Sequence, residues 1–244
     1  MESGDRAPLW VTLLGGFRLT AGDDRVAVSG GAERLLAFVA LCSHAVSRNL
    51  LAGTLWPDAP ERRACASLRS ALARMNGVKQ RILHVGTTEI GLSPGVGVDF
   101  HDARALARRI LDPALPAGEG DLSAKTVSLL SNRLLPGWYD DWVLVEAEEW
   151  HQLRLHALET LTSGFIAAGR FADAVAAASV AARAEPLRES ACAALIRAHL
   201  AEGNQVEALR HFERYERHLH TELGLHPTPR LCELVSGLRP AARR

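Results

Sequence analysis

Two six-residue segments that lie 34 residues apart restrict most strongly what this 244-residue chain can fold into. Residues 169–174 (GRFADA) and 203–208 (GNQVEA) match glycine on glycine and alanine on alanine. A period of this length is typical of stacked helical hairpins, in which glycine lies near the turn and alanine lies where two helices touch closely. Beyond these segments the pattern is imperfect, because Ala182 corresponds to Glu216. The repeat predicts an array of helical hairpins in the second half of the chain.

The rest of that half agrees with this interpretation. The apolar spacing predicts helices over 103–111, 123–131 and about 143–168, separated by a loop rich in proline, glycine and alanine at 112–121 and an irregular stretch at 134–142. We therefore expect residues 99–244 to form an all-α domain of tetratricopeptide-like hairpins.

The first 98 residues follow a different order of elements. Two alternating runs predict strands at 10–19 and 25–28, joined through 21–24, and two more at 80–85 and 89–92, joined through the turn 86–88. Between these pairs the pattern predicts helices at 33–43, 48–56 and 61–75. Strands, three helices and a closing hairpin are the order of a winged helix-turn-helix, which we expect over residues 1–98. The predicted fold class is mainly α with small β elements.

Polar and proline residues mark the ends of two of these helices. Ser47 is expected to cap the second helix, which Pro57 ends because proline disfavours helical geometry in the residue before it. Asp58 is the expected cap of the third helix, at the start of a short turn through Pro60.

The third helix separates apolar and cationic residues onto two faces. At about 100° per residue one face is apolar, and the other consists of Arg62, Arg63, Ala66, Ser67, Arg69, Ser70, Ala73 and Arg74. The apolar face holds Ala64, Cys65, Leu68, Ala71, Leu72 and Met75. Short side chains and guanidinium groups on an open face could approach duplex phosphates and guanine edges in the major groove. A simple solvated helix surface is the alternative.

The distribution of charge favours the nucleic-acid interpretation. The chain as a whole has 28 basic and 28 acidic residues, so its net charge indicates no partner. Residues 61–81, however, contain six basic residues, Arg62, Arg63, Arg69, Arg74, Lys79 and Arg81, against one acidic residue, Glu61. Positive charge is therefore concentrated where the third helix and the hairpin are expected.

A group of aromatic and acidic residues lies within the second half, before and at the start of its long helix. Trp138, Tyr139, Trp142 and Trp150 either pack the helical domain against its leading segment or form a protein-contact patch. The nearby carboxylates, Asp140, Asp141, Glu146, Glu148 and Glu149, could repel DNA or meet a basic partner.

Neither catalysis nor a metal site is indicated. The glycine-containing segments at 91–97 and 118–126 lack the spacing of nucleotide-binding loops, and we expect no enzyme activity and no cofactor. His211 and His218, seven residues apart, could share a helix face, but no ligand set completes a site, and a solvated surface is expected. The cysteines Cys42, Cys65, Cys192 and Cys232 show no disulfide or zinc spacing, and no segment resembles a signal peptide or membrane span, so a cytoplasmic location is expected.

The chain resembles bacterial regulators of the Streptomyces antibiotic regulatory protein type in their short form. Residues 9–98 resemble the winged helix of the OmpR/PhoB class, through LLGGFRL at 13–19, LLAGTLWP at 50–57, ASLRSAL at 66–72 and LSPGVGVD at 92–99. Residues 99–244 resemble the bacterial transcriptional activation domain, through LPGWYDDW at 135–142, RLHALE at 154–159 and ELGLHPTP at 222–229.

This resemblance implies a function and a set of partners. We expect a transcriptional activator that binds double-stranded promoter DNA at direct repeats, associates with the nucleoid and recruits RNA polymerase and its sigma factor, typically for a biosynthetic gene cluster such as one for antibiotic biosynthesis. A homodimer is expected at least on DNA, because a single recognition module has modest affinity. A helical-repeat scaffold whose winged helix binds protein rather than DNA is the alternative.

The residues expected to act follow from the winged-helix docking mode. Arg69, Ser70 and Arg74 are the candidates for base or phosphate contacts, Arg62, Arg63 and Ser67 for phosphate contacts, and Thr87 and Thr88 for backbone contacts by the hairpin tip. The turn Pro57, Asp58, Ala59 and Pro60 is the expected polymerase contact.

Overall fold

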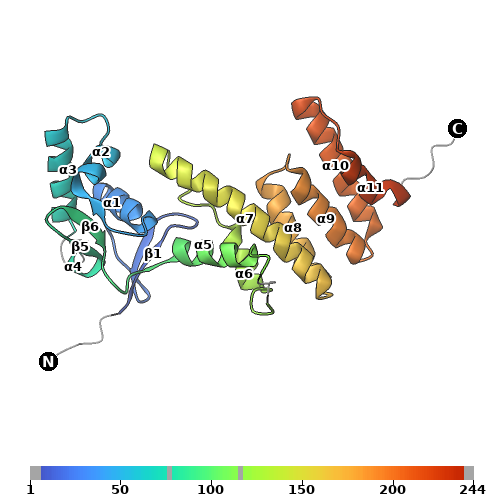
Figure 1. The fold of residues 1–244 in the computed structure, drawn as a ribbon, viewed down its shortest axis with the longest axis horizontal. Coiled ribbons are helices and arrows are strands. Elements are labelled where there is room, and N and C mark those ends of the chain that lie inside the picture. Colours follow the sequence, from blue (N-terminus) through green and yellow to red (C-terminus); the bar gives the residue numbers. More distant parts are fainter. Residues whose placement is uncertain (1–6, 76–78, 115–117, 239–244) are drawn as a thin grey trace. The chain divides into compact units, whose positions relative to one another are not determined.

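The computed structural model describes residues 7–75, 79–114 and 118–238 (Figure 1). The chain divides into two compact units, which are described separately below. The first contains residues 1–104 and 133–150, and the second contains residues 105–132 and 151–244. The domain boundary predicted between residues 98 and 99 stays a prediction. Within the described residues, no helix combines the length and apolar composition that crossing a bilayer requires.

The first unit begins with a four-stranded sheet in the order β3-β2-β1-β7. Its strands are β1 (Leu9–Thr12), β2 (Arg18–Ala21), β3 (Asp24–Arg25) and β7 (Gly97–Val98). β1 pairs antiparallel with β2 and parallel with β7. The prediction of one strand over 10–19 was wrong, because Gly15 and Gly16 adopt positive φ angles of 82° and 126° and turn the chain back on itself. Of the strand expected at 25–28, only Arg25 belongs to a strand, β3.

Three helices and a second sheet complete the winged helix. The helices are α1 (Gly30–Leu41), α2 (Arg48–Leu55) and α3 (Glu61–Ala73). The sheet has the order β4-β6-β5, with strands β4 (Val46–Ser47), β5 (Leu83–Val85) and β6 (Glu89–Leu92). The expected hairpin around residues 86–88 is present, but residues 80–82 belong to the short helix α4 (Lys79–Ile82), not to a strand. Ile82 is fully buried there, because one helical turn directs it into the core.

One expected helix cap is present and the other is not. The hydroxyl of Ser47 accepts a hydrogen bond from the backbone N–H of Leu50 at 3.2 Å, which confirms the cap of α2. Asp58 does not cap α3. That helix begins after Pro60, whose carbonyl accepts hydrogen bonds from the N–H groups of Arg63 and Ala64 at 2.8 Å and 3.0 Å. The N-cap is therefore Pro60 rather than Asp58, and α3 begins at Glu61, where the sequence predicts it.

Residues 133–150 pack onto the winged helix within the first unit. Trp142 lies edge-on to Phe38 of α1, with ring centroids 5.1 Å apart, and also meets Trp138, which contacts Phe17. Trp150 is buried edge-on to Phe100. These three tryptophans are therefore packing residues, as the first of the two interpretations predicts. Tyr139, the fourth member of the group, is 82% exposed.

A half-buried carboxylate, that of Asp99, links the start of the chain to the end of the winged helix. Asp99 accepts hydrogen bonds from the backbone N–H groups of Leu13 at 2.8 Å and Leu14 at 3.1 Å. Burial raises the pKa of this carboxyl, although these hydrogen bonds act in the opposite direction. Asp99 thereby orders the turn after β1 and the first residue of α5 (Asp99–Ile110) together.

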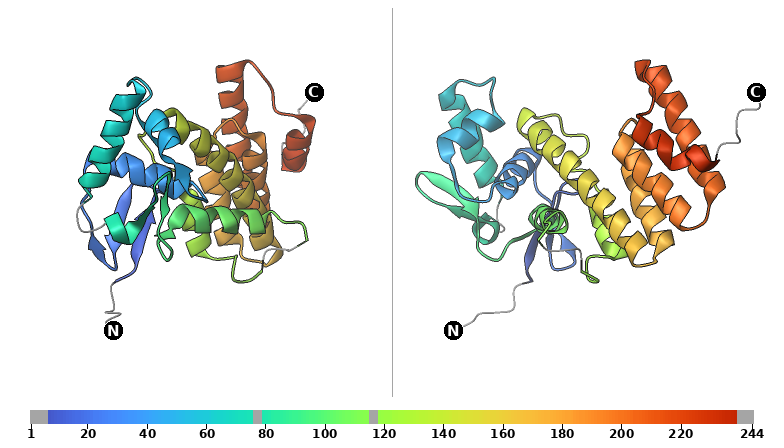
Figure 2. Two further views of the ribbon diagram at one scale, coloured as in Figure 1. Left: turned by 60° about the vertical axis from the view of Figure 1, so that its left-hand side comes forward. Right: turned by 45° about the vertical axis from the view of Figure 1, so that its right-hand side comes forward.

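The second unit is all-helical (Figures 1 and 2). Besides the end of α5 it contains α6 (Ala124–Ser131), most of α7 (Asp141–Ala167), α8 (Phe171–Ala184), α9 (Glu189–Ala201), α10 (Gln205–Leu223) and α11 (Pro229–Val235), followed by a 3-10 turn (Ser236–Leu238). α8 packs against α9, and α9 packs against α10.

The two repeat segments form equivalent turns. Gly169 and Gly203 both have positive φ angles, 71° and 85°. In each turn the residue after the glycine donates its N–H to the carbonyl five positions earlier, from Arg170 to Phe165 and from Asn204 to His199. Five residues further on, Ala174 and Ala208 are fully buried. The repeat therefore encodes turn geometry and close helix contact, as the sequence predicts.

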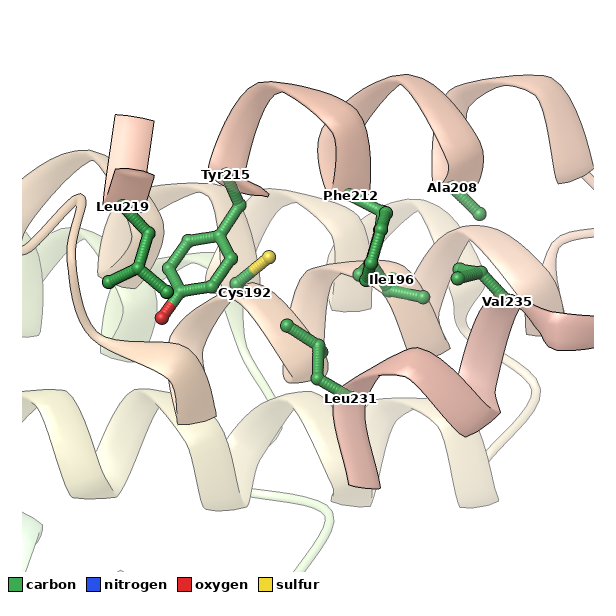
Figure 3. Packing of buried hydrophobic residues seen from close by; sticks show 8 residues of the cluster. All are labelled: Cys192, Ile196, Ala208, Phe212, Tyr215, Leu219, Leu231 and Val235. Atoms are coloured by element: carbon green, nitrogen blue, oxygen red, sulfur yellow. The ribbon is translucent and has the colours of Figure 1, made fainter. Parts of the chain in front are cut away.

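The last hairpin has a core of its own. Figure 3 shows Cys192 and Ile196 of α9, Phe212 and Tyr215 of α10 and Leu231 of α11 directed toward one another. Phe212 is fully buried at the position that corresponds to Ala178 in the previous repeat. The larger side chain fills the space that α11 closes on one side. The two repeats therefore differ in side-chain volume at this position but keep the same 34-residue spacing.

Candidate nucleic-acid interface

Helix α3 presents the two faces that its sequence predicts. Ala64, Leu68, Ala71, Leu72 and Met75 are buried, whereas Cys65 is only half-buried. The opposite face is open to solvent. Its exposed members are Arg62, Arg63, Arg69, Ser70, Ala73 and Arg74, and Ala66 and Ser67 are half-buried beside them. The buried face packs on α1 and α2, so the rotation of the helix about its axis is determined by the core.

Within the residues that the structure describes, the guanidinium groups of α3 and of its C-cap Arg74 have no carboxylate partner. In the described part of the chain, no ion pair includes Arg62, Arg63, Arg69 or Arg74. Some arginines elsewhere are paired with carboxylates. Examples are Arg34 with Asp140, Arg104 with Glu146 and Glu149, and Arg188 with Glu159. The positive charge of α3 is therefore available to an external polyanion, and counterion release would favour that contact.

A cleft of about 410 Å³ joins α3 to two other elements. Ser47, Arg48 and Asn49 contribute the start of α2, Cys65, Leu68 and Arg69 contribute α3, and Thr87 and Thr88 contribute the hairpin tip. The sequence-predicted residues Arg69, Thr87 and Thr88 are thus brought to one place. Arg62, Arg63, Ser67 and Ser70 lie on α3, which ends at Ala73, two residues before the predicted end. These four residues and Arg74, the C-cap of the helix, do not line the cleft.

The start of α2 is a part of this surface that the residue pattern did not single out. The backbone N–H of Arg48 donates to the carbonyl of Thr88 at 2.8 Å, and its side chain donates to the carbonyl of Gly86 at 3.2 Å. Ser47 was recognised only as a helix cap. An arginine and an asparagine directly after a capping serine are the signal that could have indicated an anion-binding helix start.

The turn between α2 and α3 is accessible. Pro57, Asp58 and Pro60 are exposed, Ala59 is half-buried, and the N–H of Ala59 donates to the carbonyl of Trp56 at 3.2 Å. The hydrogen bond and the two prolines restrict the turn to a narrow range of shapes. Such a turn suits recognition by another protein.

The acidic stretch after the turn at residue 137 is mostly neutralised within the first unit. Asp140 pairs with Arg34 of α1. Glu146 and Glu149 both accept hydrogen bonds from Arg104 at 3.2 Å. These carboxylates therefore support the packing of residues 133–150. Because they are paired with arginines, they have less charge left to repel DNA or attract a basic partner.

The described histidines and cysteines are spread over the fold rather than gathered in one cluster. Across residues 7–75, 79–114 and 118–238, no three His, Cys, Asp or Glu side chains converge as a ligand set. The four cysteines are free thiols. His211 is not simply solvated, because its ring is half-buried and stacks on His199 at a centroid distance of 5.2 Å.

A family model decides which class of protein this is. Residues 98–239 match the bacterial transcriptional activator domain. The chain belongs to that family. The match confirms the resemblance to regulators of the Streptomyces antibiotic regulatory protein type that the sequence indicates, and it identifies the second unit's hairpins as part of the activator domain. A comparison with curated proteins finds no match.

A solved structure shares the fold. The structure of Mycobacterium tuberculosis EmbR in complex with a low-affinity phosphopeptide superposes with a TM-score of 0.69 at 20% sequence identity. The alignment covers 96% of this chain and 66% of the EmbR chain. The similarity therefore extends over the winged helix as well as the activator domain, and the predicted fold class, mainly α with small β elements, is confirmed.

Proposed function

We propose that this activator binds promoter DNA sequence-specifically through α3 and the hairpin tip. The observation that carries the proposal is the exposed cationic face of α3, whose four arginines make no ion pair with any residue that the structure describes. Clustered positive charge beside a cleft attracts a polyanion, and this favours DNA binding over a simple solvated surface.

In the proposed complex α3 enters the major groove. Arg69, Ser70 and Arg74 reach base edges or phosphates, and Arg62, Arg63 and Ser67 bind the phosphates that flank them. Thr87 and Thr88 contact the sugar-phosphate backbone from the hairpin tip. The cleft places Asn49 and Ser47 on the same side as Arg69, which gives the backbone a further polar contact.

The proposal extends to assembly and partners. Two copies bind direct repeats, because one winged helix supplies only modest affinity. The turn from Pro57 to Pro60 contacts RNA polymerase and its sigma factor, and the target promoters belong to a biosynthetic gene cluster. The protein acts in the cytoplasm on the nucleoid, without a cofactor and without a catalytic step.

A titration of DNA binding against salt tests this function. Footprinting on the DNA that flanks the protein's own gene would first define a site, and fluorescence anisotropy would then measure affinity from about 50 to 200 mM salt. A specific activator should bind the site tightly and lose affinity steeply as salt rises. Little binding even at low salt would instead favour the helical-repeat scaffold with a winged helix that binds protein.

Single substitutions locate the contact. Arg69→Ala and Arg74→Ala should each cost about 1–3 kcal/mol on the footprinted site. Arg25→Ala is the matched control, because this exposed arginine lies on β3 in the N-terminal sheet and should leave affinity unchanged. Unchanged affinity in both α3 variants would remove the recognition-helix assignment.

A further inference from the structure

The second unit contains a hollow that the proposed DNA-binding function does not use. It has a volume of about 420 Å³ and lies among α8, the turn before α9, α9 and α10. Sites for small organic ligands usually fall between about 300 and 1,000 Å³ and combine an apolar lining with a few polar groups. The size therefore suits one small molecule, and it is too small for an extended peptide of several residues.

The hollow has an apolar floor, and its two ring side chains, Tyr215 and His211, are restrained by contacts with other residues. Ala182, Leu195 and Tyr215 contribute apolar surface, and the Tyr215 hydroxyl donates to the carbonyl of Leu187 at 3.3 Å, which restrains the ring. His211 forms another flat wall, restrained by its stacking on His199 with an interplanar angle of 13°. Flat, pre-ordered walls favour a flat ligand because little side-chain entropy is lost on binding.

The edge of the hollow is cationic. Arg183 and Arg214 are exposed and make no ion pair with any residue that the structure describes. Arg188 also lines the hollow but shares its charge with Glu159 at 2.7 Å. The single carboxylate of the lining, Glu185, lies 3.3 Å from His151 of α7. Two unneutralised guanidinium groups thus remain for a ligand, and their fork geometry matches a carboxylate.

We propose that this hollow binds a small organic carboxylate with a flat apolar body. The carboxylate pairs with Arg214 and Arg183, and the apolar body lies on Ala182, Leu195 and Tyr215 against the ring of His211. A bare inorganic anion would leave the apolar floor uncovered, and a neutral hydrophobe would leave the two guanidinium groups unmatched. Both chemical features of the lining are satisfied only by a ligand that carries both.

Calorimetric titration of the full chain with 1-naphthoate tests the proposal, with naphthalene-1-carboxamide as the neutral analogue of the same shape. The carboxylate should bind at least about tenfold more tightly, because hydrogen bonds to charged groups are the stronger ones. Binding should also shift the imidazole NMR signals of His211 and His218, which line the hollow, and leave the exposed His156 of α7 unchanged. Absence of naphthoate binding at millimolar concentration, or equal affinity for the carboxamide, would overturn the proposal.

Two variants of α10 separate the hollow from general charge effects. Arg214→Gln should lower naphthoate affinity by about tenfold. Arg217→Gln removes an arginine from the same helix that does not line the hollow. Among the described residues this arginine donates to the carbonyl of Glu213, so the variant's affinity should equal that of the wild type. Both side chains are exposed, and unchanged melting temperatures would verify that both variants fold. Equal affinities in the two variants would contradict the assignment.

Discussion

Arg48 donates a side-chain hydrogen bond to the carbonyl oxygen of Gly86, and the N–O distance is 3.2 Å. The backbone N–H of the same arginine donates to Thr88 at 2.8 Å. The first residue of α2 is therefore hydrogen-bonded to a residue on each side of Thr87 in the hairpin turn. This contact connects the helical part of the proposed DNA surface to its hairpin part, so the spacing between them does not depend on the turn alone.

Replacement of Arg48 should loosen the hairpin. Arg48→Ala removes one side-chain hydrogen bond, and we expect the free energy of unfolding to fall by about 0.5–1.5 kcal/mol. Amide hydrogen exchange at Thr87 and Thr88 should become faster. Asn49→Ala is the control, because Asn49 lines the same cleft but, in the described part of the chain, makes no hydrogen bond with Gly86 or Thr88. Exchange rates at the turn that match those of the control would refute the role of Arg48.

Arg62 should contribute to affinity without contributing to sequence choice. In the proposed complex it contacts a phosphate, so Arg62→Ala should weaken binding to specific and non-specific DNA alike and reduce the salt slope by about 1. Arg69→Ala should instead relax preference at one base position. Competition titrations with single-base variants of the site would measure the difference. A change in base preference for Arg62→Ala would place that residue in the groove rather than on the backbone.

Gly97 should not tolerate a side chain. A methyl group there would lie 2.0 Å from Cε3 of Trp10, whose indole covers the glycine across the β1–β7 pair. Gly97→Ala should destabilise the protein by about 1–3 kcal/mol through overpacking, as measured by urea denaturation. Gly53→Ala in α2 has open space and should be neutral or stabilise by up to about 1 kcal/mol. Equal stability of the two variants would mean that Trp10 moves freely.

Phe212 should be the most sensitive position of the last hairpin. Its ring is fully buried in the cluster of α9, α10 and α11, so Phe212→Ala should cost about 3–5 kcal/mol of unfolding free energy. Val206, on the same helix, is 60% exposed, and Val206→Ala should stay within about 0.5 kcal/mol of the wild type. A small loss for Phe212→Ala would indicate that α11 does not close this core in solution.

His211 should make the stability of the activator domain depend on pH. Burial, followed by the charges of His199 and Arg214, lowers its pKa in the folded protein, and Glu207 opposes the shift. The unfolded chain therefore binds the proton first, and stability should fall as the pH drops below about 6.5. His211→Gln should flatten this dependence between pH 7 and 5 in thermal melts. His156→Gln, at an exposed position of α7, should leave the slope unchanged, and identical slopes in both variants would exclude His211 as the cause.

Local patterns predicted the features that depend on neighbours in sequence. The two faces of α3 were correct because helical periodicity is determined by a few consecutive residues, and the core needs only the apolar face. The cap at Ser47 and the turns at Gly169 and Gly203 were equally local. Asp58 failed as a cap because it lies two residues before the N-cap position, which Pro60 occupies.

Features that join distant residues were not accessible in this way. The cleft at Arg69 needs β4 to pair with β6, so that Ser47 and Thr88 meet although they lie far apart in the chain. The acidic residues of 140–149 looked available to a partner, but Arg34 pairs with Asp140 across 106 positions. No local pattern contains such a pairing, because side chains find partners only after the backbone has folded.

The sequence by itself determined the helices, their apolar faces, the repeated hairpin turns and the class of protein, since these follow from the order of neighbouring residues. The tertiary structure decided which charges remain unneutralised. Arg34, Arg104 and Arg188 met carboxylates when the chain folded, whereas the arginines of α3 did not. An ion pair depends on distance in space, which the fold alone establishes, and the charges left over are those that a ligand or a nucleic acid can bind.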